Sequence, residues 1–288
     1  MADSVEMADI RGLDINKVVK GFALTEYVFK NLVTVSNTSA DHIRWYQETA
    51  ADLTATAPSA VANVSPLSSF PNLEVTWTRQ TSYVKKYAAE GFISMEDMKS
   101  SDIDVVTRTL LRLTRAVVKQ VDSDIYNVLT EDQSPSTIGT GAATGTGWDD
   151  TTNGNPVLDI MAAKQAIAEN DYDTSGCIIA MNPKNHKDLL NYLITVKGSS
   201  IPAFSSEKVR SGVVMNILGC GVVVSNNVVA DSVFVGLPAR AVTWKQHTPT
   251  TSRAIEEAGI GTKFRVWELG VGLLTDPKAS YLITDTDT

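Results

Sequence analysis

The part of the sequence that most constrains the fold is residues 101–130, thirty residues that contain no glycine and no proline. Apolar residues recur through it at steps of three and four, the period of a helix with one buried face. Ser101 is placed to cap the first turn, where Asp102 and Asp104 are favoured by the helix dipole. We therefore predict one helix roughly 40 Å long, at 1.5 Å per residue. Its apolar positions are Ile103, Val106, Leu110, Leu113, Val117, Val121, Ile125 and Val128.

The polar face of this predicted helix is basic. At 100° per residue, four cations fall within an arc of roughly 60°, opposite the apolar positions. A basic face is most often simply solvated, but it also suits contact with a polyanion or with the carboxylates of a neighbouring subunit. The sequence leaves these alternatives open. The four cations are Arg108, Arg112, Arg115 and Lys119.

Two segments near the N-terminus have the alternating, aromatic and β-branched pattern of strands, residues 42–48 and 73–79. The residues between them, 49–72, are rich in Ala, Thr and Ser and contain three prolines. A segment of this length is too long for a hairpin turn and carries little that would build a core. We interpret it as a projecting loop whose partner is another chain.

The other elements predict an α+β protein. Before the first strand, residues 14–29 indicate a short helix, and residues 134–155 read as a loop. Asn182 and Pro183 are typical of a helix cap and first position. Helices are expected at 156–170 and 182–193, and strands at 176–181, 213–225, 232–236, 241–245, 263–274 and 279–284.

No group of residues predicts an enzyme, a metal site or a bound cofactor. The glycine string at 139–145 looks like a dinucleotide-binding loop, but no apolar strand precedes it and no helix can follow it, so we expect a flexible loop. The three histidines lack metal-ligand spacing. Cys177 and Cys220 are expected to be small buried packing residues rather than nucleophiles. The acidic pairs Asp149-Asp150 and Glu256-Glu257 are expected to be solvated in loops.

Composition excludes several classes. The 288 residues carry 25 Lys+Arg against 33 Asp+Glu, a net charge of −8, which argues against a chain that grips nucleic acid through its overall field. A hydrophobic fraction of 43% excludes general disorder. Two cysteines are too few for a disulfide framework and suit a reducing compartment. We expect no secretory signal at the N-terminus and no membrane-spanning segment.

The order of these parts resembles the major capsid protein of tailed bacteriophages, a fold shared with encapsulins and the herpesvirus capsid floor. The residues that carry the resemblance run from about Asp41 onward: Phe92-Ile-Ser-Met-Glu-Asp-Met-Lys-Ser-Ser-Asp-Ile-Asp-Val before the long helix, Ile178-Ile-Ala-Met-Asn-Pro-Lys-Asn-His-Lys-Asp-Leu, and Asn216-Ile-Leu-Gly-Cys-Gly-Val-Val-Val-Ser followed by Ser232-Val-Phe-Val-Gly. These are architectural phrases and not catalytic motifs.

The resemblance implies five regions. They are an N-terminal arm (1–40), an extended loop over a neighbour (41–91), a peripheral domain (92–155) with the spine helix 101–130, an axial domain (156–240), and return strands of the peripheral domain (241–288). It implies that the basic face of the spine helix lies toward packaged DNA or another subunit. Inter-subunit contacts of the extended loop are expected from Trp45, Tyr46, Pro58, Pro66, Phe70, Trp77 and Arg79.

The function that the resemblance implies is a non-enzymatic major capsid protein. It would assemble in the host cytoplasm, as hexamers and pentamers, into an icosahedral or prolate shell of the virion around double-stranded DNA. Its partners would be itself, a portal protein, the packaged DNA without sequence specificity, and a separate scaffold, protease or cement protein, with no membrane. Because no Lys or Arg occurs between Trp45 and Thr78, the Lys–Asn cross-link of some members is not expected. The alternative is an encapsulin that encloses a cargo enzyme, with residues 14–29 as its cargo-binding helix.

Overall fold

The computed structural model describes residues 15–23, 27–47, 63–70, 78–100, 104–130, 138–145, 147–150, 152–196 and 216–287. The chain divides into two compact units, each described here by itself. Unit 1 comprises Met1–Ile43, Ser82–Ile125 and Trp244–Leu273. Unit 2 comprises Arg44–Thr81, Tyr126–Thr243 and Leu274–Thr288.

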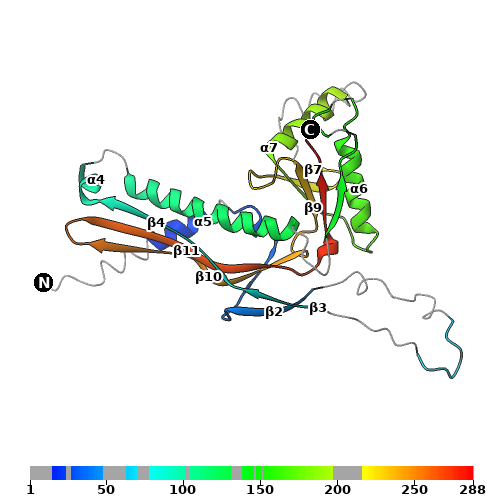
Figure 1. Ribbon diagram of the computed structural model, residues 1–288, viewed down its shortest axis with the longest axis horizontal. Coiled ribbons are helices and arrows are strands. Elements are labelled where there is room, and N and C mark those ends of the chain that lie inside the picture. Colours follow the sequence, from blue (N-terminus) through cyan, green and yellow to red (C-terminus); the bar gives the residue numbers. More distant parts are fainter. Residues whose placement is uncertain are drawn as a thin grey trace. The chain divides into compact units, whose positions relative to one another are not determined.

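Unit 1 is built on a four-stranded sheet with the order β1-β10-β11-β4. β11 and β4 are antiparallel, with Gly261 opposite Ser94 at one end and Gly270 opposite Lys85 at the other (Figure 1). The indole of Trp244 lies directly over Gly270, where a Cβ would come within 2.4 Å of the ring. The strands are β1 (Thr34–Asn37), β4 (Lys85–Ser94), β10 (Val242–Glu257) and β11 (Gly261–Leu274).

The long helix is confirmed as α5 (Val105–Thr130). The predicted cap Ser101 lies outside the described residues; Asp104 begins the helix instead, since its carboxylate accepts the backbone N–H of Thr107 at 2.9 Å. The α5 helix packs on β4 at Gly91, where a Cβ would meet Thr109 at 3.1 Å. The predicted apolar positions from Leu110 to Val128 are buried.

A cluster of buried polar side chains in unit 1 holds the segment that begins at residue 27; we call it the anchor. The Lys30 ammonium lies 2.5 Å from Glu268, a fully buried carboxylate that also accepts hydrogen bonds from Tyr27 and, at 2.9 Å, from Thr250. On α5, Asp122 accepts the backbone N–H of Val28 at 2.6 Å and that of Lys30 at 3.1 Å. Burial raises the pKa of Asp122, against the opposing effect of these N–H donors.

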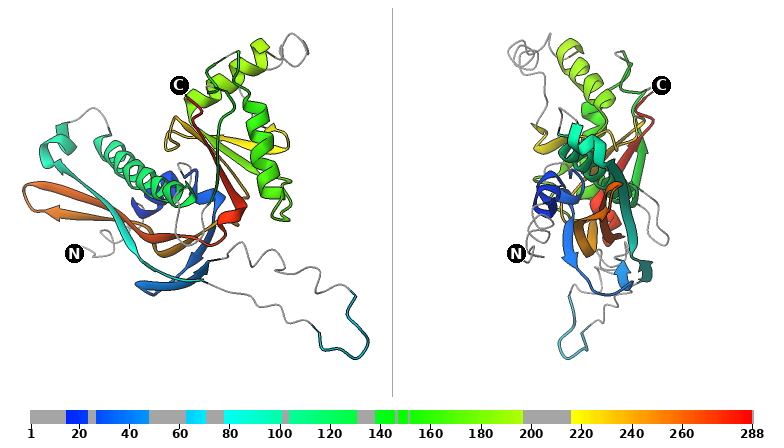
Figure 2. Two further views of the ribbon diagram at one scale, coloured as in Figure 1. Left: turned by 45° about the vertical axis from the view of Figure 1, so that its right-hand side comes forward. Right: turned by 90° about the vertical axis from the view of Figure 1, so that its left-hand side faces the viewer.

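Unit 2 contains a six-stranded sheet with the order β5-β12-β9-β6-β8-β7. The pairs β12/β5 and β6/β8 are parallel, whereas β12/β9, β6/β9 and β7/β8 are antiparallel, so the sheet is mixed (Figure 2). The central strand β9 is buried along its whole length. The strands are β5 (Gly139–Ala142), β6 (Ile178–Met181), β7 (Asn216–Ile217), β8 (Cys220–Val224), β9 (Ser232–Gly236) and β12 (Ser280–Thr284).

Two helices of unit 2 begin as the sequence predicts. Asn155 caps α6 (Pro156–Ala168) and Asn182 caps α7 (Pro183–Asn191), each with proline at the first position. The α6 helix buries Ile160, Ala163 and Ile167 and contacts β12 and β9. A π-helical turn, Tyr192–Val196, continues α7.

Several expectations from the sequence are wrong. The glycine string is not simply a loop: Gly139–Ala142 is strand β5, and the Tyr281 ring covers it, so that a Cβ on Gly139 would lie 2.6 Å from the ring. Glu256 and Glu257 end strand β10 rather than lying in a loop. Cys177 and Cys220 are fully buried, as expected, but they form a disulfide across the start of β6 and β8, with Cα atoms 4.6 Å apart.

Two further elements were not expected from the sequence. Residues 85–94 form strand β4, and a short helix, α4 (Met95–Ser100), follows it directly. At the N-terminus the described helix covers residues 15–23 only, and a 3₁₀ turn, Lys30–Leu32, follows in place of a helix to residue 29.

Candidate interaction surfaces

The first candidate surface is the basic face of α5. The side chains of Arg108, Arg112, Arg115 and Lys119 are all exposed. The two acidic side chains within α5 are engaged elsewhere: Asp122 is buried in the anchor, and Asp124 accepts a hydrogen bond from Lys85 at 2.9 Å. Asp104, just before the helix, bonds Thr107, which lowers the pKa of Asp104. The four cations therefore form a strip about three turns long on the exposed surface of α5, at 3.6 residues per turn.

The second candidate surface is the extended loop. Its stem is a two-stranded sheet of β2 (His42–Gln47) and β3 (Thr78–Tyr83). The strand predicted at 42–48 is therefore confirmed. The strand predicted at 73–79 overlaps β3 only at residues 78 and 79. Of the residues expected to contact a neighbour, Trp45 is buried within the chain, whereas Tyr46 and Arg79 are exposed. Pro58 and Trp77 lie outside the described residues.

Residues 63–70 form the described part of the loop between these strands; we call them the loop segment. Ser68 donates its backbone N–H to the Ser65 carbonyl at 3.1 Å, which closes a tight turn around Pro66 and Leu67. Leu67 has a φ of 68°, a left-handed conformation that a leucine adopts only at a cost in free energy. The turn presents two apolar side chains to solvent, because Leu67 is fully exposed and Phe70 is 88% exposed.

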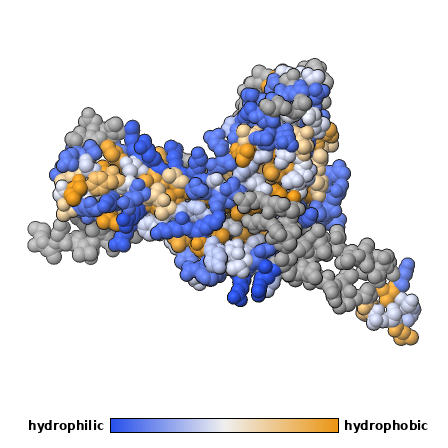
Figure 3. Space-filling model, in the orientation of Figure 1, coloured by the Kyte–Doolittle hydropathy of each residue, from blue (hydrophilic) through white to orange (hydrophobic). Residues whose placement is uncertain are grey.

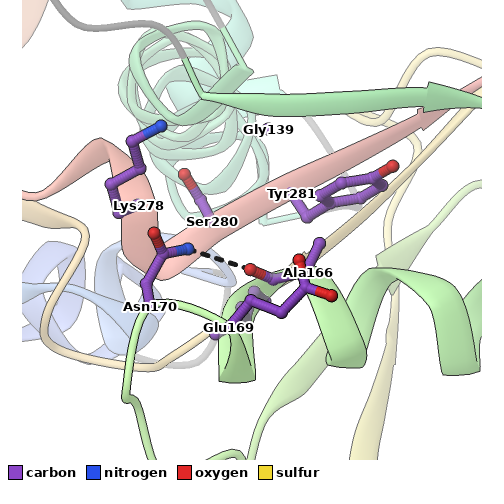
Figure 4. A pocket seen from close by; sticks show the side chains of 8 residues that line it. Gly139, Ala166, Glu169, Asn170, Lys278, Ser280 and Tyr281 are labelled. Carbon is purple, nitrogen blue, oxygen red and sulfur yellow. Dashed lines mark hydrogen bonds between the residues drawn. The ribbon is translucent and has the colours of Figure 1, made fainter. Parts of the chain in front are cut away.

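A cavity of about 250 Å³ in unit 2 is lined by residues of β5, α6 and the approach to β12 (Figure 4). Its acidic and basic side chains are Glu169 and Lys278. Glu169 accepts a hydrogen bond from Gln165 at 2.9 Å, and Asn170 donates to the Ala166 carbonyl, so both side chains serve the end of α6.

Other kinds of site were also sought in the described part of the chain. No group of three or more His, Cys, Asp or Glu side chains there could hold a metal ion. Among the helices in those residues, none is long and apolar enough to cross a membrane.

The sequence placed the basic face correctly on the exposed side of α5, but it missed part of the loop surface. Phe70 and Pro66 were expected to contact a neighbour and are exposed. Leu67, the most exposed of the large apolar side chains, was not singled out. The signal was Pro66 after Ser65, since serine and proline favour the first two positions of a β-turn, whose central side chains face solvent.

Known proteins of similar structure identify the fold. Among solved structures, the chain resembles a virus-like particle from Pyrococcus furiosus at 12% identity and a TM-score of 0.65, over 95% of this chain and 99% of that one. It resembles a structure from Mycobacterium phage Che8 at 15% identity and a TM-score of 0.63, over 91% and 92%. It also resembles the capsid of the cyanophage P-SCSP1u at 14% identity and a TM-score of 0.65, over 90% and 88%.

At these identities the structural likeness shows the fold alone. A search of curated protein sequences found no match. The sequence model of the phage capsid proteins matches residues 78–283, which is well over half of the chain and includes α5 and most strands of both large sheets. The chain therefore belongs to the phage capsid protein family, whose members build the shell of the virion.

Proposed function

We propose that this chain is the repeating subunit of an icosahedral or prolate shell that encloses packaged double-stranded DNA. The observation that carries the proposal is the loop segment: a tight turn holds Leu67 and Phe70 in solvent, although each would gain about 1.5–3 kcal/mol on burial. A monomer has no use for such a surface. A shell, in which each copy lies against a neighbour, buries it at every position.

In this proposal the residue ranges take the roles that the resemblance implies. The sheet and spine helix of unit 1 serve as the peripheral domain, with residues 241–288 returning to it in part. Residues 156–240, within unit 2, serve as the axial domain at five- and six-fold centres. The region around β2 and β3 reaches over a neighbouring copy, and residues 1–40 act as the N-terminal arm. The shell performs no catalysis.

The basic face of α5 is proposed to face the packaged DNA. Four aligned cations attract phosphates regardless of sequence, and a net charge of −8 keeps that attraction weak and local. Weak attraction suits a wall around DNA that a motor drives in. A portal protein and a separate scaffold, protease or cement protein complete the set of proposed partners.

The first test is electron microscopy of the chain expressed alone and together with scaffold and portal proteins from the same genome. Closed shells, tubes or capsomer-sized rings would support the proposal. A chain that stays monomeric at high concentration in every combination would overturn it. Shells that hold a cargo enzyme instead of DNA would support the encapsulin alternative.

A second test addresses the DNA. A variant with Arg108, Arg112, Arg115 and Lys119 all changed to Gln should form heads with less DNA or lower stability, because the strip of positive charge is lost while the helix-forming tendency is kept. Wild-type head yield and wild-type genome content in this variant would rule out the DNA-facing role.

A further inference from the structure

The two cysteines of the chain meet at the base of a long excursion in unit 2. Cys177 lies just before β6, the chain then passes through α7, and it returns at Cys220, the first residue of β8. The disulfide joins residues 43 positions apart and closes this excursion at its base. Because the sequence holds only two cysteines, the thiol chemistry of the chain is the chemistry of this one bond.

The disulfide ties down a hairpin at the end of the sheet. Strands β7 and β8, residues 216–224, pair with each other; we call these residues the edge hairpin. Among the described strands, β8 joins the rest of the sheet through β6. On its other side β6 pairs with β9, which is buried along its whole length. The bond therefore connects the edge hairpin to the buried centre of the sheet.

Apart from its cysteine, the edge hairpin is weakly packed. Cys220 is the one buried residue among residues 216–224, all of which the structure describes. Leu218 and Val224 are each 40% exposed, and apolar surface lies beside polar surface over the part of unit 2 that faces the viewer (Figure 3). The α6 helix reaches the hairpin through Lys164, whose ammonium donates to the Leu218 carbonyl at 2.6 Å. A segment with so little buried surface opens at a low cost in free energy.

The proposed shell function gives this bond two chemical surroundings in turn. A subunit that assembles inside a cell meets a reducing cytosol, in which disulfides rarely persist. A released particle meets an oxidising medium. Two cysteines in 288 residues suit a chain that is made under reducing conditions. The bonded pair in the structure therefore represents the oxidised form of the chain.

We propose that Cys177 and Cys220 are a redox-controlled lock: they are thiols while the shell assembles, and after release they form the disulfide that holds the edge hairpin on the sheet. This inference rests on the proposed function, because it requires assembly inside a cell. Two S–H bonds break, one S–S bond forms, and two electrons and two protons pass to the oxidant. The oxidant is a small-molecule disulfide, which becomes two thiols, or dioxygen, which becomes hydrogen peroxide.

Burial makes the lock depend on opening of the edge hairpin. Both cysteines are 0% exposed, whereas thiol–disulfide exchange requires access to a sulfur atom. The hairpin must therefore open before an oxidant or a reductant can react with either cysteine. Once the bond has formed, it suppresses this opening, so reduction of the folded chain is slow.

Trapping of free thiols tests when the bond forms. Cells that produce the shell are precipitated with acid and redissolved in denaturant with N-ethylmaleimide, and purified particles kept with oxidised glutathione are treated in the same way. We expect two alkylated cysteines per chain inside the cell and none in the oxidised particles. A disulfide that is already complete inside the cell would overturn the lock, as would two free thiols in the oxidised particles.

Hydrogen exchange tests what the bond holds, in the unassembled subunit as well as in shells. The backbone amides of residues 221–224 should exchange at least tenfold faster in the reduced chain than in the oxidised chain, whereas those of β9 should exchange alike in both. The matched control is Cys177→Ala/Cys220→Ala, whose edge hairpin should exchange like that of the reduced wild type and should not respond to oxidant. Equal exchange of residues 221–224 in the reduced and oxidised wild type would overturn the lock.

A variant outside the cysteine pair tests the role of opening. Lys164→Met removes the donor to the Leu218 carbonyl, so dithiothreitol should reduce the folded variant several-fold faster than the wild type. The control Lys187→Met removes an ion pair with Asp188 elsewhere in unit 2 and should be reduced at the wild-type rate. An unchanged rate in Lys164→Met would show that reduction does not pass through opening of the edge hairpin, and it would contradict the lock.

The outcomes separate this inference from the shell function. A wild-type chain that assembles under no condition contradicts the shell function, and hydrogen exchange of the free subunit then still decides whether the bond holds the edge hairpin. Shells that form normally while Cys177 and Cys220 stay in one redox state throughout overturn the lock alone.

Discussion

The anchor and the loop segment depart in opposite ways from the usual distribution of side chains, in which charged residues are exposed and apolar residues are buried. The anchor puts Lys30, Glu268 and Asp122 inside unit 1, whereas the loop segment puts Leu67 and Phe70 in solvent. The difference lies in where their partners are. Each charge of the anchor meets its counterpart within the same chain, so burial is compensated. The apolar side chains of the loop segment have no such compensation, which is why they point to a second copy.

The largest effect should come from breaking the anchor. Glu268→Ala removes the carboxylate that accepts hydrogen bonds from Lys30, Tyr27 and Thr250, and it leaves the buried Lys30 ammonium without its ion-pair partner. We expect a loss of about 3–5 kcal/mol in the free energy of unfolding, measured by urea denaturation of the unassembled subunit.

The matched control is Glu257→Ala. It removes the partner of Lys263 from a partly exposed ion pair between β10 and β11. Its cost should be about 0–1 kcal/mol. Equal losses from the two variants would mean that the anchor stabilises no more than a surface pair does.

The disulfide between Cys177 and Cys220 cross-links two strands of unit 2, and its loss should have the next largest effect on stability. The bond joins residues 43 positions apart and restricts the unfolded chain. Cys177→Ala/Cys220→Ala should therefore lower the free energy of unfolding by about 2–4 kcal/mol. Reductant should lower the stability of the wild type by a similar amount and leave the double variant unchanged. Two alkylated cysteines per chain in denatured, unreduced wild type would contradict the bond.

The loop segment should behave in the opposite way, with its effect confined to the assembled state. Leu67→Ser and Phe70→Ser should change the unfolding free energy of the subunit by less than about 0.5 kcal/mol, because both side chains are already in solvent. Each should weaken shells by about 1.5–3 kcal/mol per copy, read from the denaturant concentration that dissociates them. Ser69→Ala, also exposed, serves as the control. Variants that destabilise the isolated subunit would contradict this distinction.

How well the sequence predicted each region follows from the range of the interactions involved. The α5 helix could be predicted because its apolar period is local and covers 26 residues. The cap of α7 at Asn182 is equally local. The anchor could not be predicted, since Tyr27 and Glu268 are 241 positions apart and each alone is an ordinary polar residue.

The missed strands and the missed disulfide have related causes. The strand predicted at 241–245 is the beginning of β10, but the rest of β10 was missed because most of it is only partly buried and lacks the alternation that would distinguish it from a loop. β5 is a strand only because Tyr281 and β12 lie beside its glycines. Cys177 and Cys220 meet because parallel strands β6 and β8 bring them into register, which no spacing in the sequence shows.

The smallest expected effect concerns the pH dependence of the anchor. Burial raises the pKa of Asp122 above that in the unfolded chain, so the native state holds this proton more tightly. Its contribution to stability is therefore fully present below the unfolded pKa and is lost as the pH rises through the native pKa. Between pH 7 and pH 4, the stability of the wild type relative to Asp122→Asn should therefore increase, as measured by urea denaturation at each pH. Asp173→Asn provides the contrast, because hydrogen bonds from Ser175 lower the pKa of Asp173 and its contribution falls on acidification. Parallel pH profiles for the wild type and Asp122→Asn would show that Asp122 titrates alike in the native and unfolded states.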